Sequence, residues 1–524
     1  MTEEIKDDIK VIAQARDTNS RGWTKLVQFY DYAGVEKKIA IPCASLAGDC
    51  KDVKSLLLDE GLYIEKESDL IKYLKSATSD KHYITVDKTG WNGDSFILPD
   101  GIIGNSNNEL YFPNSVGDNP YKTKGTLEEW KENIGKYCGG NSRLIFAVSA
   151  AFAAALLYLL DEENTGFHIV GGSSCGKSTI LKVACSVWGD PSYIKTWRAT
   201  DNAIEWTAHL RNDTLLVLDE LGQIDPSKAG DVAYLLGNGQ SKGRCNKDGT
   251  AKKTSSWRLL YLSSGEKDLS DCGSESKKKT KAGQLMRLIN IPAIPDGSLF
   301  GAFEDVHGKS GGKEFSEYLV SMTKEYYGTV SREFLAYLVN EGKSKIKSGF
   351  DEYKRQFIQD ILPSKADSQV QRAINKFALI SYAGELATIN NFTGFDEGEA
   401  QNAGQRCFDA WIKDRGGISN QERQDLLKQV KLFFEMHSSS RFLDLSGDAS
   451  RLINNMAGFK KEIEEEIQYW VLPAVFNSEI CGGFKNAKEI LFNAGWLESV
   501  QPVTKYVNNK ERRRVYVILP KIWE

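Results

Sequence analysis

The alternation of apolar and polar positions predicts an α/β protein of several domains. In the first 120 residues the pattern switches between strand and helix periods, with turn residues between them. Strands are expected at 23–31, 37–41, 83–86 and 95–98, helices at 52–62 and 68–75, and a turn at 90–93. Because no catalytic constellation falls in residues 1–120, this segment is predicted to be an α+β accessory domain.

A segment rich in Asn, Gly and Pro, 101–125, is predicted to be a linker. After it, helices are expected within 127–160 and at 231–236, and apolar strands at 166–170, 214–220, 257–264 and 288–292. Short continuous apolar runs are typical of parallel strands buried on both faces. Residues 126–300 are therefore predicted to form a nucleotide-binding core.

One apolar run, 144–160, resembles a membrane span. The run is slightly short and rich in alanine, and a strand follows it at once. We therefore expect a buried helix that packs against the nucleotide-binding core, and no membrane partner.

Helical periodicity dominates residues 301–438, with segments at 315–327, 331–339, 370–387 and 422–436. A helical block after a nucleotide-binding core suits a lid. Arg372 is a candidate to touch the γ-phosphate from this lid, although lid helices also carry many structural arginines.

Residues 440–524 differ in character from the lid region. A helix is expected at 484–494, followed by strands at 503–507 and 514–518 with a basic turn between them. A helix followed by a hairpin with a basic tip is typical of a winged-helix domain, in which Lys510, Arg512 and Arg513 would touch DNA phosphates. A small protein-protein module fits the same pattern.

A phosphate-loop pattern, G-x-x-x-x-G-K-[ST], lies between the strand at 166–170 and an amphipathic helix. The candidate nucleotide-binding residues are Gly171, Gly172, Ser173, Ser174, Cys175, Gly176, Lys177, Ser178 and Thr179. Glycines let the backbone curl so that several N–H groups and a helix start face an anion. Lys177 is expected to reach the β- and γ-phosphates of ATP, and the Ser178 hydroxyl to hold Mg²⁺.

The strand expected at 214–220 ends in two acidic residues. Such an adjacent pair distinguishes a protein that hydrolyses a nucleotide from one that only binds it. Asp219 suits a Walker B role, in which it coordinates Mg²⁺ directly or through water. Glu220 is placed to orient and activate an attacking water. An acidic strand end that faces solvent is the alternative.

Two further residue types suit a hydrolytic site. Ser263 or Ser264, at the end of the strand at 257–264, could reach the γ-phosphate or the attacking water; Ser264 is our candidate. Arg287 precedes the strand at 288–292, where oligomeric ring ATPases often carry the arginine finger that completes a neighbour's site. An exposed arginine at a helix end is the alternative for Arg287.

An insertion between Glu220 and the strand at 257–264 predicts a basic hairpin. Asp248-Gly249 is a strong turn pattern, and basic residues flank it at near-alternating positions. Lys242, Arg244 and Lys247 would form a positive finger near its tip, able to grip a phosphate backbone. A solvated, charged hairpin without a ligand is the alternative.

Composition limits where nucleic acid could bind. The formal net charge is only −4, so any DNA contact must come from local basic patches. The nine cysteines are scattered without a C-x-x-C pair, and no signal peptide is visible, so we expect reduced thiols and a cytoplasmic protein.

On these residues, the chain resembles the nine-two-seven family of domains of unknown function, which includes MCM-like, self-loading AAA+ replicative helicases of mobile genetic elements. The resemblance is sharpest at 171–179, 218–223, 237–239, 283–287 and 377–385. The basic hairpin is the most specific part, since it is similar to the presensor hairpin of MCM-type and superfamily III helicases. One departure is the Ser263-Ser264 pair, where related helicases often have Asn.

The resemblance implies a P-loop AAA+ (ASCE) core with a presensor-1 β-hairpin, a hexameric ring, ATP as fuel and single-stranded or forked DNA in the pore. Primase and single-strand binding protein are possible partners. The hypothesis is thus an ATP-dependent DNA helicase. The rivals are an ATP-switched replication initiator without processive unwinding, and a small-molecule kinase, for which the basic hairpin would have no use.

Overall fold

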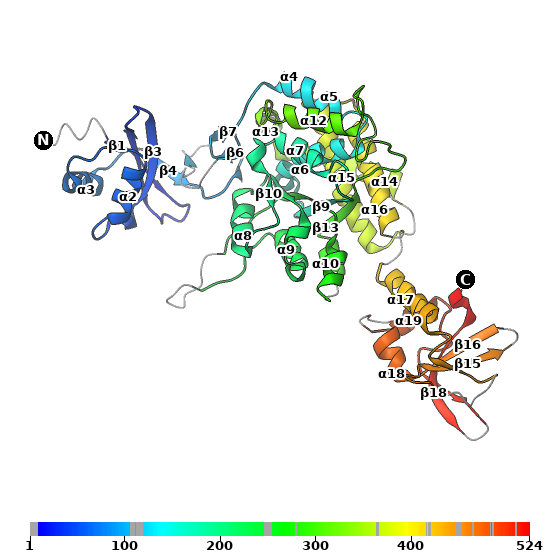
Figure 1. Ribbon diagram of the computed structural model, residues 1–524. Coiled ribbons are helices and arrows are strands. Elements are labelled where there is room, and N and C mark those ends of the chain that lie inside the picture. The colour runs from blue at the N-terminus through cyan, green and yellow to red at the C-terminus, as the bar shows by residue number, and fades with distance from the viewer. Residues whose placement is uncertain are drawn as a thin grey trace. The chain divides into compact units, whose positions relative to one another are not determined.

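The computed structural model describes residues 9–104, 110–111, 119–245, 254–277, 280–362, 366–415, 417, 421–446, 453–463, 466–482, 484, 487–508 and 511–523 (Figure 1). The chain divides into two compact units, Met1–Leu362 with Arg372–Trp411, and Pro363–Gln371 with Ile412–Glu524. The domain borders expected at residues 120, 300 and 438 stay predictions.

The N-terminal part of the first unit is a five-stranded sheet with two helices on one face (Figure 1). Its order β3-β2-β1-β4-β8 joins β1 (Ile9–Arg16), β2 (Thr24–Tyr30), β3 (Glu36–Pro42), β4 (His82–Thr85) and β8 (Leu110–Tyr111). Helices α2 (Lys51–Asp59) and α3 (Glu67–Ser76) bury Leu57 and Leu74 against it. The Lys25 ammonium donates to the Leu74 and Ala77 carbonyls, both at 2.6 Å, and so satisfies the end of α3. The predicted mixture of strands and helices is present, and β1 is a strand that we did not predict.

Part of the segment predicted as a linker is strand. Strand β7 (Gly101–Ile103) pairs with β6 (Ser95–Leu98), which pairs with β5 (Gly90–Asn92). The predicted turn at 90–93 is therefore misplaced, because the chain reverses after Asn92. Trp91 ties this small sheet to the core, since its indole N–H donates to the Ala155 carbonyl at 2.8 Å.

The core of the first unit is a five-stranded parallel sheet in the order β10-β11-β12-β9-β13. The strands are β9 (Thr165–Val170), β10 (Lys195–Thr196), β11 (Leu215–Asp219), β12 (Leu260–Gly265) and β13 (Leu288–Pro292). Strands β11 and β12 are almost wholly buried, as continuous apolar runs predict. Because all five strands are parallel, their carboxyl ends share one edge of the sheet, where the phosphate-loop pattern follows β9.

Helix α6 (Ser142–Leu160) is long and apolar enough to cross a membrane, but 94% of that window is buried inside the protein. It packs against α7 (Lys177–Ser186) and the parallel sheet. Two indoles donate to carbonyls on α6, from Trp91 to Ala155 and from Trp188 to Ala151. The expectation of a buried helix is confirmed.

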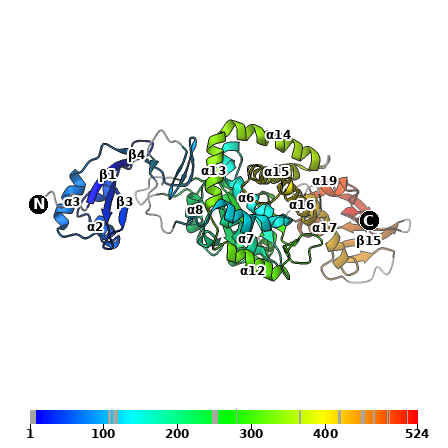
Figure 2. The same ribbon diagram turned by 90° about the horizontal axis from the view of Figure 1, so that it is seen from above.

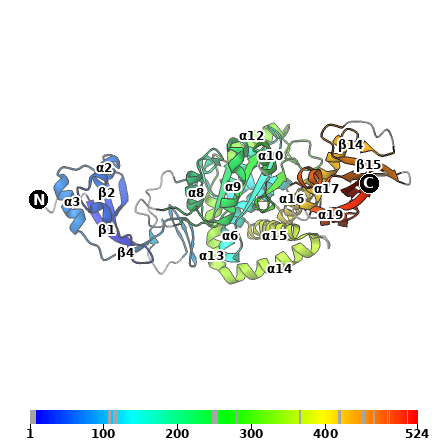
Figure 3. The same cartoon turned by 90° about the horizontal axis from the view of Figure 1, so that it is seen from below.

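The remaining helices of the first unit surround the sheet and extend beyond it. They are α4 (Leu127–Trp130), η2 (Lys131–Gly135), α5 (Lys136–Cys138), α8 (Asp201–Leu210), α9 (Pro226–Asn238), α10 (Leu269–Glu275), α11 (Ala282–Leu285), α12 (Gly312–Met322), α13 (Thr329–Glu341), α14 (Lys343–Ile361), α15 (Ser368–Ile389) and α16 (Glu399–Asp414). Helices α13 and α14 follow one another and α14 packs on α6 (Figure 2), while α9 and α10 lie side by side (Figure 3). The predicted helical character of 301–438 is confirmed.

The second unit is a five-stranded sheet, in the order β14-β15-β16-β18-β17, with helices on one face. Its elements are α17 (Gln421–His437), β14 (Phe442–Asp444), β15 (Gly458–Ile463), β16 (Glu466–Val471), α18 (Pro473–Val475), η5 (Phe476–Ile480), α19 (Ala487–Asn493), β17 (Val503–Tyr506), β18 (Arg512–Ile518) and η6 (Pro520–Trp523). The predicted helix and hairpin are α19, β17 and β18. Strands β14 to β16 widen the sheet beyond the prediction, and α17, expected in the lid region, packs into this unit's core.

Candidate active site

The phosphate loop connects the end of β9 to the start of α7, and glycines shape it. Gly176, the residue before α7, has φ 109°, which only glycine adopts readily. A Cβ there would lie 3.0 Å from the Phe303 ring, and one on Gly171 would lie 2.9 Å from the Ala293 Cβ. The loop therefore has no room for side chains at these two positions, while Gly172 faces open space.

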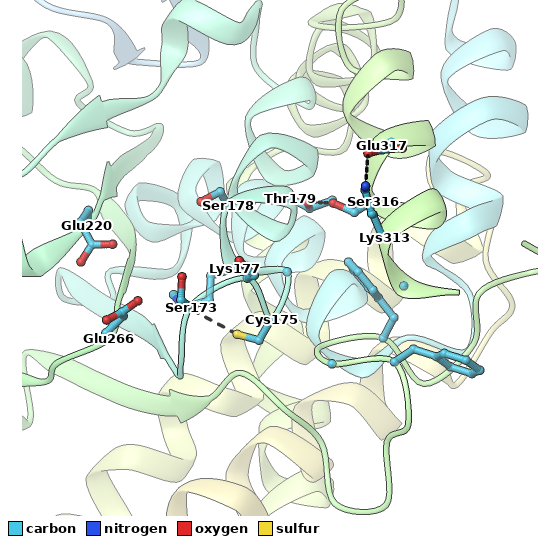
Figure 4. A pocket seen from close by; sticks show the side chains of 16 residues that line it. Ser173, Cys175, Lys177, Ser178, Thr179, Glu220, Glu266, Lys313, Ser316 and Glu317 are labelled. Atoms are coloured by element: carbon cyan, nitrogen blue, oxygen red, sulfur yellow. Dashed lines mark hydrogen bonds and ion pairs between the residues drawn. The ribbon is translucent and has the colours of Figure 1, made fainter. Parts of the chain in front are cut away.

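Three side chains of α7 face the pocket at the loop: Lys177, Ser178 and Thr179 (Figure 4). The Lys177 ammonium donates to the Gly171 carbonyl at 2.8 Å and to the Gly172 carbonyl at 2.6 Å. It is therefore folded over the loop, and an anion held by the loop would meet a buried positive charge. The Thr179 hydroxyl is hydrogen-bonded to that of Ser316 on α12 at 2.5 Å.

The two strand-end acids lie beside the phosphate loop: Glu220 lines the pocket, and Asp219 contacts Ser178, which also lines it. The Ser178 hydroxyl donates to Asp219 Oδ2 at 3.4 Å, and the Ser264 hydroxyl donates to Asp219 Oδ1. Glu220 has φ 60°, a left-handed conformation that is uncommon for a residue with a side chain, and its carboxylate lines the pocket (Figure 4). Strained backbone of this kind is concentrated at functional sites.

The structure distinguishes the two serines that the sequence left open. The Ser263 hydroxyl accepts from the Trp197 indole at 2.8 Å and is bonded to His168 Nδ1 at 2.9 Å. Because His168 Nε2 lies 2.9 Å from the Lys267 carbonyl, it must carry the proton, and burial lowers the pKa of His168 to about 4. Ser263 is thus occupied in a buried network, and Ser264 is the serine beside Asp219.

The far wall of the pocket was not predicted. The pocket has a volume of about 690 Å³, within the range of ligand sites, and its wall includes Glu266, Phe300, Phe303, Lys313 and Glu317. Segment 300–303 is fixed to the loop, since the Ala302 N–H donates to the Cys175 carbonyl at 2.8 Å. No motif marks these residues, because only the fold brings Glu266, segment 300–303 and α12 to the loop.

Arg287 lies at the opposite edge of the sheet from the phosphate loop. It precedes β13, whereas the loop follows β9, and the two parallel strands pair from Gly166–Leu288 to Val170–Pro292. The Arg287 guanidinium donates to Asn238 Oδ1 at 2.8 Å and lies 4.1 Å from the Tyr234 ring centroid. A strand of five residues spans about 16 Å, so Arg287 cannot reach the loop of its own chain.

Arg372 is exposed on α15 and, like Arg287, lies near Lys376. Burial lowers the pKa of Lys376 to about 8, and the neighbouring guanidinium groups of Arg287 and Arg372 add to this effect. Among the residues that the structure describes, no hydrogen bond or ion pair joins Arg372 to the phosphate loop, so a lid role for Arg372 stays a prediction.

The basic residues predicted to bind DNA are only partly within the described structure. Lys242 and Arg244 are described, and both pair with acids of α8, as detailed below. In the second unit, Arg512 and Arg513 start β18 with exposed side chains, and Arg513 pairs with Glu511 at 2.5 Å. Lys247 and Lys510 lie outside the described residues.

Residues 2–257 match the family profile described as Domain of unknown function (DUF927). This segment makes up just under half of the chain. It contains the five-stranded N-terminal sheet, the three-stranded sheet, the phosphate loop, strand β11 with its two terminal acids, and the basic insertion. The resemblance inferred from the sequence is therefore confirmed.

A solved structure described as the active helicase Cch of SCCmec type IV has a fold similar to that of this chain. The alignment covers 98% of this chain and 92% of that chain, with a TM-score of 0.72 and 17% identity. A structure of the NrS-1 C-terminal region covers 73% of this chain at a TM-score of 0.30 and 9% identity, which is too low to support an argument. No curated protein sequence matches the chain.

Proposed function

We propose that this protein is an ATP-dependent DNA helicase of the replicative, mobile-element type, built on a P-loop AAA+ core. The observation that carries the proposal is the convergence of a phosphate-loop lysine and serine with Glu220 on one pocket, where the serine also donates to Asp219 at the end of β11. The fold that this chain shares with a solved helicase supports it.

The pocket suits a magnesium nucleoside triphosphate. Backbone N–H groups of the loop and the Lys177 ammonium would hold the phosphates. Ser178 and Asp219 supply hydroxyl and carboxylate oxygens, the ligands that Mg²⁺ prefers, and the ion would supply charge that polarises the phosphates. Glu220 would orient and deprotonate the attacking water, with Ser264 holding the Asp219 carboxylate in place.

The proposed arginine finger and the proposed DNA contacts in a pore require more than one chain. Because Arg287 lies at the sheet edge opposite its own loop, we propose that it serves a neighbouring copy in a ring, a hexamer by family resemblance. The basic hairpin would grip single-stranded DNA in the pore through Lys247. In the second unit, we propose a winged-helix-like role in which Lys510, Arg512 and Arg513 touch phosphates.

Two measurements on the purified protein test the proposal. ATP hydrolysis should rise on addition of single-stranded DNA, and a forked duplex should be unwound. Lys177→Ala is expected to lower hydrolysis about 10²-fold or more, because the phosphates lose their main cationic partner. Lys247→Ala is expected to abolish unwinding, with DNA-free hydrolysis as its control. If DNA-free hydrolysis fell to the level of Lys177→Ala, the hairpin would not be a DNA contact.

The second candidate is an ATP-switched initiator that binds DNA without processive unwinding. The exposed arginines at the start of β18 favour it, because site binding needs the second unit but no stepping. Strand displacement on a long duplex separates the two, since only a helicase releases the full-length strand.

A further inference from the structure

The base of the basic insertion is an ordered hairpin stem, which we define as residues 239–245 and 254–257. Gln240 and Ser256 form an antiparallel bridge, and the Ser241 N–H donates to the Ser255 carbonyl at 2.9 Å. The Trp257 N–H donates to the Gly239 carbonyl at 2.9 Å on the same ladder. The two ends of the insertion are therefore paired with each other, and what holds this stem fixes where the insertion leaves the core.

Helix α8 holds the stem through its acidic residues. The Arg244 guanidinium donates to Glu205 Oε2 at 2.6 Å and to Asn202 Oδ1 at 2.6 Å. The Lys242 ammonium donates to Asp201 Oδ2 at 2.6 Å, and the Lys242 backbone N–H donates to Glu205 Oε1 at 3.2 Å. Three positions on one face of α8 thus bind two alternate residues of the stem.

Glu205 is the strongest of these attachments. Its side chain is only 4% exposed, and each of its two oxygens accepts a hydrogen bond from the stem. A buried carboxylate requires a hydrogen-bonded cation, so Arg244 cannot leave Glu205 without a large penalty. The Asp201–Lys242 pair is exposed, with side chains 34% and 55% accessible, and contributes little by comparison.

The start of α8 is tied to the nucleotide pocket. Strand β10 lies just before α8 and pairs with β11, with Thr196 opposite Asp219 at the end of β11. Trp197 is fully buried, and its backbone N–H donates to the Asp219 carbonyl at 3.2 Å while its indole donates to Ser263. A helix of ten residues therefore connects the acid end of β11 to the hairpin stem.

We propose that α8 positions the DNA-gripping hairpin relative to the nucleotide pocket, with Glu205 as the positioning residue and Lys242 and Arg244 as anchors of the stem rather than DNA contacts. The inference rests on the proposed helicase function and names the element that couples its two sites. It also changes the expectation for Lys242 and Arg244, whose cationic groups are already bound to carboxylates.

A charge exchange tests the inference, with the ratio of DNA-stimulated to DNA-free ATP hydrolysis as the readout. Glu205→Gln is expected to lower this ratio at least about fivefold, while DNA-free hydrolysis stays within about twofold. Arg244→Glu alone should lower the ratio as well, and the double variant Glu205→Arg with Arg244→Glu should recover half of it or more. A direct phosphate contact by Arg244 predicts the opposite, because a glutamate at 244 would repel DNA whatever residue 205 is.

Two further variants guard against a folding defect. Asn202→Ala removes only the second contact of Arg244 at an exposed position, and it is expected to lower the ratio about twofold. Asp201→Asn, in the exposed pair, should change it little. Thermal unfolding of every variant accompanies the assay.

The outcomes separate the inference from the function on which it rests. An unchanged ratio in Glu205→Gln and Asn202→Ala, or no recovery in the double variant, overturns the role of α8 alone. If wild-type hydrolysis does not respond to DNA, the helicase proposal fails and the inference fails with it. That failure is visible in the wild-type protein before any variant is made.

Discussion

At the scale of single residues, the two serines at the end of β12 have different partners. Substituting them is therefore expected to have different effects on stability and activity. Ser263→Ala leaves the Trp197 indole without its acceptor in a buried place, so we expect a loss of about 1–3 kcal/mol in unfolding free energy. Ser264→Ala removes a donor to Asp219, so we expect hydrolysis to fall about tenfold with little loss of stability. Urea unfolding and turnover on the same two variants check this; the reverse pattern would exchange their roles.

Phe300 is the aromatic residue of the pocket that best suits a nucleobase. It lines the pocket beyond the phosphate loop and remains 37% exposed, whereas Phe303 is buried. Stacking of a base on an aromatic ring contributes about 1–3 kcal/mol, so Phe300→Ala should raise the KM for ATP about tenfold. Leu299→Ala is the matched control, because Leu299 is 88% exposed and does not line the pocket. Inhibition by tripolyphosphate, which has no base, should be equal in all three proteins; a Phe300→Ala change in that inhibition would contradict a base-specific role.

Asp213 makes the unfolding free energy of the protein depend on pH, and the direction of that dependence follows from its pKa. Burial raises the pKa of Asp213 to about 6 from 3.8, although its Oδ2 accepts a hydrogen bond from the Trp91 backbone N–H at 3.0 Å. Between pH 4 and 6 the folded protein therefore binds more protons than the unfolded chain, so this group's contribution to stability is lost as pH rises through that window. The difference in unfolding free energy between the wild-type protein and Asp213→Asn should therefore fall by about 2 kcal/mol from pH 4 to pH 6. Urea titrations across this range measure the difference, and parallel curves for the two proteins would contradict the assignment.

At the scale of elements, the strands that are buried on both faces of the sheet were the ones that the sequence predicted well. Strands β9, β11 and β13 were predicted closely because their apolar runs are continuous. Strand β10 has only two residues, both exposed, and so leaves no pattern to recognise. Strand β1 alternates apolar and polar residues except at Ile12, so its pattern was present in the sequence but was missed. The loop and acid residues were predictable from their motif. The pocket wall from α12 was not, because it depends on long-range packing that no local pattern records.

Helix α15 is packed too closely for a side chain at Gly384. A Cβ there would lie 2.2 Å from the Ser149 hydroxyl oxygen of α6 and 2.5 Å from the Ala400 Cβ of α16. Gly384→Ala should therefore lower the unfolding free energy by about 1–3 kcal/mol, despite the better helix propensity of alanine. Adding Ser149→Ala removes the closest atom, the hydroxyl oxygen, which has no hydrogen-bond partner among the described residues. The second substitution should therefore restore part of the loss. Denaturant midpoints of the single and double variants measure this coupling, and strictly additive effects would show that the helices shift apart instead.

At the scale of the whole molecule, the parallel sheet separates the two halves of the proposed hydrolytic site. The phosphate loop and both acids lie at the carboxyl edge, and Arg287 lies at the amino edge. A head-to-tail arrangement of copies brings opposite edges together and generates a ring when the rotation closes. One chain alone would then be a poor ATPase, and activity would depend on protein concentration.

Mixing two inactive variants tests whether the finger comes from a neighbour. Lys177→Ala has a defective loop but an intact Arg287, and Arg287→Ala has the converse, so each should be nearly inactive alone. In an equal mixture with random exchange, an interface works only where an intact loop meets an intact arginine, so roughly a quarter of the interfaces, and of wild-type hydrolysis, should return. Arg287 also holds Asn238 in its own chain, so thermal unfolding must show that Arg287→Ala is folded. If both variants are folded and exchange subunits, yet the mixture stays as inactive as its components, Arg287 serves only the structure of its own chain.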